Sequence, residues 1–528
     1  MTETAGRHEQ NIHAADEAMT MKKKQLYFNL AAQMVSFCVS FAISFFISPI
    51  IVREVGKEAH GFLGLANSFV GYVTIITVAL NSLAGRFVTV CLHRKDEDSA
   101  NRYFTSVFFA NTLIVAVLLI PAIIFISFLE RFFQVPPQIL VDVKVTFALV
   151  FLGFFAQLMF SVFSVATFVT NKMYLASIRT IEANLLRLAV IVVTFFLLGP
   201  SVAFVSLGLF VYYSFIAATN VHYTKRLLPQ IQIQKKYFDL SKIKELIISG
   251  CWSSISSLSN TLLEGLDLLI SNLLLGAAAM GTLSIVKTIP NMIYQCMYSV
   301  LSVFNPQLTI SYAKGDNQGV CDYLNYACKN AGCLIAMPVG FMIAFGDRFF
   351  HLWMPTEDGL QLWILTMLSM GELLFAGSVI VMHNLFTVTN HLKKPAMVTL
   401  ATGILSTIIV FTLLTTTDLG IYAIVAVSSA LALLRHLLFS IPYSANCVGC
   451  KPKKFYWIAG RSMLFVGIAA GLGFLLKWLL APADWLTLIL SAGIMCVLTI
   501  GIVFIFFFSK EEKADLLTLF FKKKKRDA

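Results

Sequence analysis

One stretch decides the class of fold: residues 249–275 read S-G-C-W-S-S-I-S-S-L-S-N-T-L-L-E-G-L-D-L-L-I-S-N-L-L-L. A membrane-spanning helix needs about 20 predominantly apolar residues, and this stretch is long enough. It nevertheless contains two carboxylates, Glu264 and Asp267. A charge in the hydrocarbon core costs at least about 2.5–3.5 kcal/mol, so each one needs a partner or a water-filled face. The stretch therefore predicts a membrane helix whose polar face meets another helix or a water-accessible cavity.

The whole chain has the composition of an integral membrane protein. Of its 528 residues, 58% are hydrophobic and 13% are charged, and the mean hydropathy is +0.79. The apolar runs are continuous rather than alternating, which excludes a membrane β-barrel. We predict an all-α polytopic membrane protein with about 14 transmembrane helices, at residues 26–52, 61–83, 104–129, 145–169, 174–198, 201–221, 246–274, 282–308, 329–350, 360–388, 395–415, 419–442, 455–480 and 485–508.

The basic residues predict the orientation. Most of the 40 Lys and Arg residues fall in alternate loops and at both ends of the chain. Because cytoplasmic loops are enriched in Lys and Arg, we expect both termini of this multi-pass protein to be cytoplasmic. The net charge of +12 is then mostly a topology signal. Nucleic acid is not expected as a partner, because the basic residues form no single face.

The chain shows an internal repeat. A gapless shift of 220 residues places Gly56 on Gly276, Gly61 on Gly281 and Asp96 on Asp316, and it aligns the first predicted span with the seventh. Six spans per half give both halves the same orientation, which suits two bundles around a cavity and alternating access. The expected parts are a cytoplasmic tail (1–25), two parallel-repeat six-helix lobes (26–221 and 246–442) joined by a linker (222–245), two C-terminal helices with their preceding loop (443–508) and a basic tail (509–528).

The basic tail has two alternative interpretations. L-L-T-L-F-F (516–521) is followed by K-K-K-K-R (522–526). This combination of apolar and polybasic residues fits a short interfacial helix on anionic membrane lipids. A disordered solubilising tail fits equally well.

The start of the chain resembles a known family. N-L-A-A-Q-M-V-S-F-C-V-S-F-A-I-S-F-F-I-S-P-I-I-V-R-E-V-G-K-E-A-H-G-F-L-G-L-A-N-S-F-V-G-Y (29–72) is similar to the start of bacterial polysaccharide exporters and lipid-linked oligosaccharide flippases. Most of the resemblance lies in P-I-I-V-R-E-V-G-K-E-A-H-G-F (49–62). These proteins belong to the multidrug/oligosaccharidyl-lipid/polysaccharide exporter superfamily. The resemblance extends over about residues 20–450 and does not identify the subfamily.

The resemblance implies a transporter and its substrate class. Two six-helix lobes with a central cavity would move a polyprenyl-diphosphate-linked oligosaccharide from the cytoplasmic to the outer leaflet. Membrane lipids are the other expected partners. The coupling ion, H⁺ or Na⁺, and the question of whether transport is coupled at all, stay open.

Three acidic residues are candidates for ion coupling: Glu264, Asp267 and Glu372. Glu264 and Asp267 are three residues apart and share a helix face with a stripe of hydroxyl and amide side chains, at Ser253, Ser256, Ser257 and Asn260. Several interpretations of the pair remain open. It forms a fixed interhelical salt bridge, it pairs with Lys287 or Arg187 and holds these cations in place, it binds a coupling ion, or it contacts polar groups of the substrate.

Four basic residues are candidates for binding the substrate diphosphate: Arg187, Lys287, Arg435 and Arg86. A guanidinium can meet phosphate oxygens through two parallel hydrogen bonds, which favours Arg187 near the middle of its predicted span. Arg86 lies nearer the end of a span, where it can extend to the interface. An ion pair between Arg187 and the nearby Glu182 is an equally good interpretation.

Several chemistries lack their motifs. The chain has no G-x-x-x-x-G-K-[ST] loop, so we expect no ATP site and no cofactor. Cys447 and Cys450 are too few ligands for zinc, and their loop is expected to be cytoplasmic, where thiols stay reduced. We expect a transporter rather than an enzyme. An ion-coupled multidrug extruder is the first alternative, and a glycan polymerase or ligase is the second, although the largest predicted outer loop (346–360) is small for a catalytic domain.

Overall fold

The structure, a computed structural model, describes most of the chain. It covers residues 28–29, 31–170, 172–301, 308–309, 311–312, 315–389, 391–510 and 512–513, without the side chains of Glu264, Ser299, Val300, Leu301 and Ala376. The predicted tail at 1–25 and the predicted interfacial segment at 516–526 lie outside these residues.

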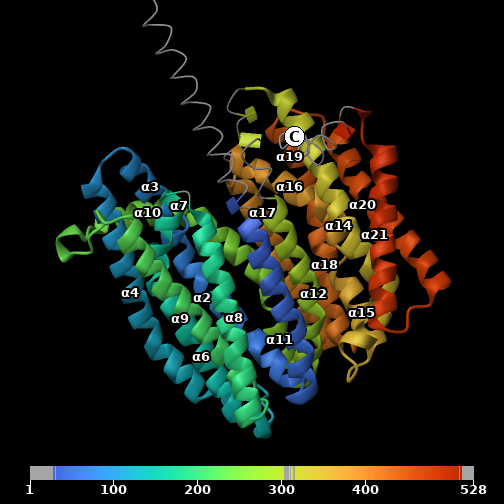
Figure 1. The fold of residues 1–528 in the computed structure, drawn as a ribbon, viewed down its shortest axis with the longest axis horizontal. Helices are drawn as coiled ribbons and strands as arrows, with labels where there is room; N and C mark the ends of the chain where they lie inside the picture. The colour runs from blue at the N-terminus through green and yellow to red at the C-terminus, as the bar shows by residue number, and fades with distance from the viewer. Residues whose placement is uncertain are drawn as a thin grey trace, which may run out of the picture. The chain divides into compact units, whose positions relative to one another are not determined.

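The described residues are helical and contain no strand. The elements are a first span (Ala31–Glu54), α2 (Lys57–Asn81), α3 (Ala84–His93), α4 (Glu97–Ser127), α5 (Leu129–Phe132), η1 (Pro137–Ile139), α6 (Leu140–Met159), η2 (Ser161–Ser164), α7 (Val165–Val169), α8 (Met173–Leu198), α9 (Val202–Leu227), η3 (Lys235–Tyr237), α10 (Leu240–Asn260), η4 (Thr261–Gly265), α11 (Asp267–Leu275), α12 (Ala277–Leu301), α14 (Asn317–Trp353), α15 (Gly359–Ser369), α16 (Leu373–Val388), α17 (Lys393–Thr416), α18 (Ile421–Arg435), η6 (His436–Ser440), α19 (Ile441–Cys447), α20 (Pro452–Leu480) and α21 (Trp485–Phe507) (Figure 1).

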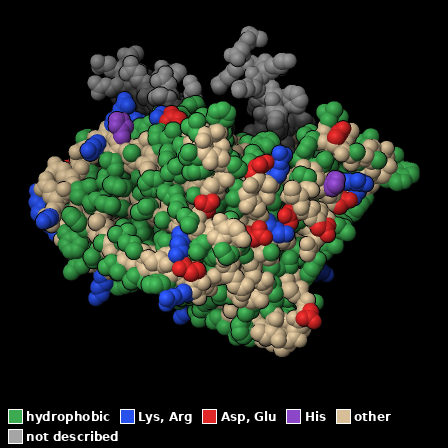
Figure 2. Space-filling model, turned by 90° about the horizontal axis from the view of Figure 1, so that it is seen from below, with side chains coloured by type: hydrophobic (Ala, Val, Ile, Leu, Met, Phe, Trp, Pro, Cys, Tyr) green, Lys and Arg blue, Asp and Glu red, His purple; other side chains and the backbone are tan. Residues whose placement is uncertain are grey.

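The helices confirm a multi-pass membrane protein. In the described part of the chain, 12 helices are long and apolar enough to span a bilayer. The other two predicted spans correspond to helices outside this set: 282–308 overlaps α12, with residues 302–307 outside the described residues, and 360–388 is divided into the shorter helices α15 and α16. Apolar side chains cover broad areas of the face seen in Figure 2, with charged side chains in small groups among them. Large apolar side chains of the long helices are also exposed, among them Phe196, Trp478 and Phe506, and such side chains suit a hydrocarbon environment.

The chain divides into two compact units. Unit 1 contains residues 1–261 and 268–284, and unit 2 contains residues 262–267 and 285–528. Within unit 1, α6 packs against α9, α8 against α9, and α10 against α2. Within unit 2, α14 packs against both α16 and α20.

Helix boundaries confirm the internal repeat. α2 and α12 both begin after a glycine with positive φ, at 106° for Gly56 and 92° for Gly276. A side chain rarely adopts such a backbone, so glycine occupies both turns. These residues are 220 positions apart, which is the offset found in the sequence.

The turn before α4 is repeated 220 residues later, before α14. Asp96 caps α4 by accepting a hydrogen bond from the backbone N–H of Ser99, and Asp316 caps α14 by accepting one from Gly319. The bond from Ser99 holds the pKa of Asp96 below its usual range. An N-cap carboxylate satisfies a backbone donor that has no partner within the helix. The repeat therefore extends to the caps of its helices.

Two matched glycines of the repeat touch each other. A Cβ atom on Gly61 would lie 2.9 Å from the Cα atom of Gly281, and one on Gly281 would lie 2.5 Å from the carbonyl oxygen of Lys57. Small residues let membrane helices approach this closely. The start of α2 and the start of α12 are therefore packed backbone to backbone.

We expect Gly281→Leu to destabilise the protein through this contact. Overpacking a close helix contact costs about 1–3 kcal/mol, and a backbone neighbour has little room to move. The matched control is Gly71→Leu, because a Cβ atom on Gly71 of α2 meets nothing within 4 Å. Thermal unfolding of the purified variants measures the difference. Equal unfolding temperatures for the two variants would contradict the close packing.

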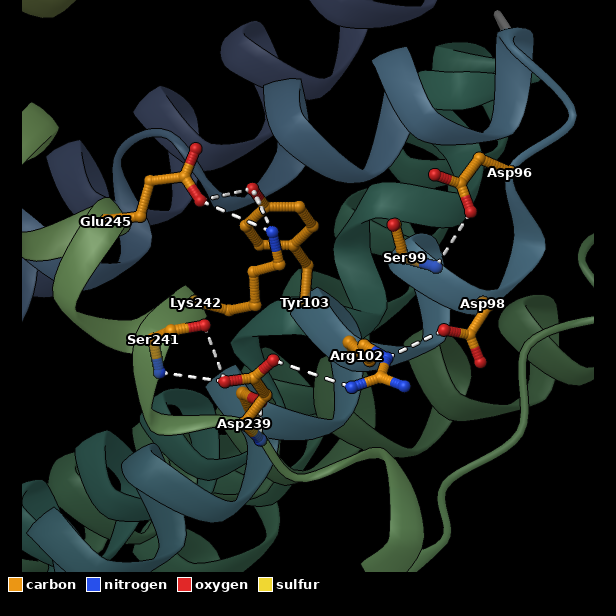
Figure 3. A network of polar contacts seen from close by, with 10 residues as sticks. Asp96, Asp98, Ser99, Arg102, Tyr103, Asp239, Ser241, Lys242 and Glu245 are labelled. Atoms are coloured by element: carbon orange, nitrogen blue, oxygen red, sulfur yellow. Dashed lines mark hydrogen bonds and ion pairs between the residues drawn. The ribbon is translucent and has the colours of Figure 1, made fainter.

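The predicted linker is fastened to the first turns of α4 (Figure 3). The Tyr103 hydroxyl donates a hydrogen bond to Glu245 at 2.7 Å, and the Lys242 Nζ atom lies 4.7 Å from the centre of the Tyr103 ring. Arg102 reaches Asp239 at 3.6 Å. The linker is thus tied by side chains to one helix of unit 1.

Three predicted spans are interrupted rather than continuous. The seventh passes through the π-helix η4 and a bend before α11, the tenth breaks at residues 370–372 between α15 and α16, and the twelfth passes through the π-helix η6. Gly265 and Gly371 lie at the first two interruptions, where glycine weakens a helix. The expectation that residues 253–267 form one regular helix face is therefore wrong, because η4 changes the spacing of side chains.

Candidate functional site

The interruptions bring ionisable side chains together in unit 2. Asp267 begins α11, Glu372 caps α16, and His436 begins η6. We call the following residues the polar cluster: Asp267, Lys287, Glu372, His383, Arg435, His436 and Ser440. Irregular backbone at membrane depth is tolerated only where it is buried in protein or lines a water-filled cavity, and π-helices occur often at functional sites.

Asp267 and Lys287 form the shortest ion pair of the cluster. The Lys287 Nζ atom lies 2.5 Å from an Asp267 carboxylate oxygen, and the side chains are 18% and 7% exposed. Burying two charges is costly unless each neutralises the other, and this pair meets that condition. The structure thus brings together one predicted ion-coupling residue and one predicted substrate-binding residue.

Glu372 connects this pair to the twelfth span. Its carboxylate experiences the positive charges of Arg435 and Lys287, and it lies 3.5 Å from the His436 Nε2 atom. The side chains of Glu372 and His436 are 10% and 8% exposed. Both Glu372 and Asp267 also lie at helix N-termini, where the helix dipole favours a negative charge. Neighbouring cations and helix N-termini thus stabilise the negative charges of Asp267 and Glu372.

Arg435 and the two histidines complete the polar cluster. The Arg435 guanidinium donates a hydrogen bond to the Thr399 hydroxyl at 3.1 Å. Ser440 lies 3.3 Å from His383 and 3.3 Å from His436. Both histidines fall within predicted spans, at 360–388 and 419–442, but the sequence assigned neither to a site, and Ser440 was missed. The only sequence signal was a histidine next to Arg435 in an apolar segment.

Arg187 lies in unit 1, on α8. Its Nε atom is buried and has no hydrogen-bond partner among the described residues, and Tyr212 and Tyr213 of α9 are its ionisable neighbours. Its alkyl chain packs at Gly208, where a Cβ atom would lie 3.2 Å from the Arg187 Cγ atom. The guanidinium is therefore a partly buried cation without a carboxylate counterpart in this part of the structure.

The alternative pairing of Arg187 with Glu182 is wrong. Glu182 pairs with Arg179 at 2.5 Å. Residues three apart lie on the same helix face, whereas residues five apart do not. Helix geometry thus leaves Arg187 available for another anion.

The remaining predicted site residues are not brought into the polar cluster by any described contact. Arg86 lies on α3 of unit 1 with an exposed side chain. Glu264 belongs to η4, and its side chain lies outside the described residues.

The cysteine expectation needs a correction. Cys450 is joined to Cys321 by a disulfide, across a sequence separation of 129 residues, so it is not a reduced thiol beside Cys447. The sequence did not indicate this pairing because it depends on how α14 packs near the loop before α20. Among the described residues, no group of three or more His, Cys, Asp or Glu is arranged to hold a metal ion.

One protein family and one bacterial relative match the sequence. The family described as "Polysaccharide biosynthesis protein" matches residues 27–309. The chain is 28% identical over 428 residues to a Bacillus subtilis (strain 168) protein described as "Uncharacterized membrane protein EpsK", covering 81% of this chain and 84% of that one.

Solved structures share the fold. The lipid II flippase MurJ in an inward closed conformation matches with a TM-score of 0.65 and 12% identity, covering 93% of this chain and 100% of its own. An outward-facing multidrug resistance MATE family transporter of the MOP superfamily matches with a TM-score of 0.63 and 13% identity, covering 81% and 96%. A MOP superfamily transporter from Pyrococcus furiosus, described as having a binding pocket of reverse polarity, matches with a TM-score of 0.60 and 13% identity, covering 84% and 96%.

Proposed function

Because the chain belongs to the family of polysaccharide biosynthesis proteins, we propose that it flips a polyprenyl-diphosphate-linked oligosaccharide from the cytoplasmic to the outer leaflet of a bacterial cytoplasmic membrane. The transporter fold it shares with a lipid II flippase supports this proposal. The two six-helix lobes, 26–221 and 246–442, would alternate access to a substrate site, with both termini in the cytoplasm.

The observation that carries the proposal is the presence of partly buried cations in membrane helices. A diphosphate must lose much of its hydration to cross the bilayer, and positive side chains replace that hydration. Arg187 has no carboxylate counterpart in the described residues, and Lys287 and Arg435 lie among acids in the polar cluster. We propose that Arg187 binds phosphate directly. Lys287 and Arg435 would supply positive charge from the second lobe. Arg86 would contact the substrate before it reaches the site.

The acids of the polar cluster suit a coupling role. Asp267 and Glu372 are buried at helix interruptions, and Glu264 lies on the same interrupted span. A carboxylate in such a place changes its charge when an ion binds, and the altered ion pair changes how the half-helices pack. We propose that these three residues link a downhill ion to export.

A cell-based measurement tests the proposed function. The gene is deleted, polyprenyl-linked intermediates are measured by mass spectrometry, and their leaflet is probed with a membrane-impermeant reagent. We expect a complete oligosaccharide lipid to accumulate in a form that the reagent cannot reach, and plasmid-borne wild type to remove it. A normal lipid pool together with new drug sensitivity would instead support the multidrug extruder, whose fold this chain shares.

A further inference from the structure

Two histidines of unit 2, the buried His436 and the partly buried His383, share one hydroxyl group. The Ser440 Oγ atom is 3.3 Å from the His383 Nε2 atom and 3.3 Å from the His436 Nδ1 atom. The ring centres are 5.5 Å apart. A serine hydroxyl donates one hydrogen bond and accepts others, so it can accept from one ring while donating to the other. The geometry permits a proton to pass between the rings through Ser440.

The π-helix η6 creates this arrangement. His436 and Ser440 are its first and last residues, and η6 packs against α16, which carries His383. A π-helix is rare, and it occurs frequently at functional sites. Here it positions Ser440 between one ring from its own turn and one ring from α16.

His436 also contacts a carboxylate. Its Nε2 atom, on the side of the ring opposite the Nδ1 atom that faces Ser440, lies 3.5 Å from the Glu372 carboxylate at the break between α15 and α16. His383, Ser440, His436 and Glu372 thus form one line of hydrogen-bonding groups. We call this line the relay.

The ligand set of the relay fits a proton better than a metal cation. The nearby charges do not by themselves distinguish the two, because Arg435 repels positive charge on both histidines and the Glu372 carboxylate offsets that repulsion, while Asp267 partners Lys287. A hard cation such as Na⁺ needs several oxygen ligands, as other hard cations do. Within the relay, the described side chains offer the Glu372 carboxylate and the Ser440 hydroxyl, together with two imidazoles. Histidine, in contrast, changes its charge by binding a proton near neutral pH.

We propose that the relay is a proton-binding site and makes H⁺ the coupling ion; this inference rests on the proposed transport function. A proton arrives at the Nε2 atom of His383. Ser440 accepts it while passing its own hydroxyl proton to the Nδ1 atom of His436, and His383 returns to its neutral form. The His436 imidazolium then forms an ion pair with the Glu372 carboxylate, which draws η6 toward the break between α15 and α16. Loss of the proton weakens that contact.

The test measures charge movement without substrate. Purified protein in liposomes is placed on a solid-supported membrane and exposed to a step in pH, between about pH 5 and 8, or to a step in Na⁺ concentration. We expect a transient current on the pH step only. His436→Gln and His383→Gln should lose it, Ser440→Ala should lose most of it, and Ser440→Thr should restore it because threonine keeps the hydroxyl. The matched control is His351→Gln, because His351 is exposed and lies on α14.

The outcomes separate the relay from the transport function. Each variant is checked for monodispersity and unfolding temperature, and Ser440→Thr carries the test if the His variants do not fold. A full pH current in His436→Gln, or a Na⁺ current that Glu372→Gln removes, would overturn the relay. A pH current with the expected variant pattern, combined with a normal oligosaccharide-lipid pool in the deletion strain, would keep the relay and reject the flippase.

Discussion

Replacing Lys287 by methionine is expected to abolish transport and to lower the free energy of unfolding by about 3–5 kcal/mol, because Asp267 would remain as a buried carboxylate without its ion-pair partner. The two side chains form a direct pair at 2.5 Å, and the Asp267 side chain is 7% exposed. Unfolding of the purified variant and flipping in reconstituted vesicles give the two measurements.

A double variant separates a structural ion pair from a functional one. Replacing a buried pair by uncharged residues is often neutral for stability, so Asp267→Asn with Lys287→Met should recover most of the lost stability. Transport should remain lost, because neither charge is present to respond to an ion or a substrate. Recovered transport would show that the pair is a fixed salt bridge. Lys477→Met is the control, because Lys477 also pairs with an aspartate, at 2.6 Å, but the partners are 23% and 27% exposed.

Arg187→Met is expected to abolish transport without destabilising the protein. Removing a partly buried cation that has no carboxylate counterpart leaves no opposite charge uncompensated, and methionine keeps most of the packing of the alkyl chain. The free energy of unfolding should therefore stay unchanged or increase, in contrast to Lys287→Met. Arg187→Lys should retain partial transport, because lysine keeps the charge but loses the two-pronged geometry.

The control for Arg187 lies on the same helix. Arg179→Met removes an arginine that is paired with Glu182 and partly exposed, so transport should change little. Flipping assays and unfolding of the three variants are compared at equal protein levels. Full transport by Arg187→Met would reject the phosphate-binding assignment.

The sequence predicted the features that depend on local or periodic signals. Long apolar runs require helices in a bilayer, so the fold class followed from composition. The repeat followed from Gly56 and Gly276, because a positive φ between two helices restricts the residue to glycine in both halves. The pairing of Asp267 with Lys287 was one of the alternatives that the sequence left open.

The rest depended on packing that sequence spacing does not encode. The breaks near Gly265 and Gly371 lie inside continuous apolar runs, and hydropathy alone cannot distinguish a broken helix from an intact one. His383 and His436 meet through Ser440, although they belong to different spans of unit 2. The choice of Glu182 as a partner for Arg187 relied on proximity in sequence, which helix geometry contradicts.

The repeat also implies a division of labour. The two halves keep their helix starts in register, at Lys57 and Ala277 and again at Met173 and Lys393. At that offset, however, Asp267 corresponds to Ile47 and Glu372 to Leu152. Among the residues that the structure describes, the buried acids thus lie in the second copy only. We therefore expect the two copies to have different roles in transport. An ion would act on the second copy, which carries the acids, while the first copy keeps the substrate bound.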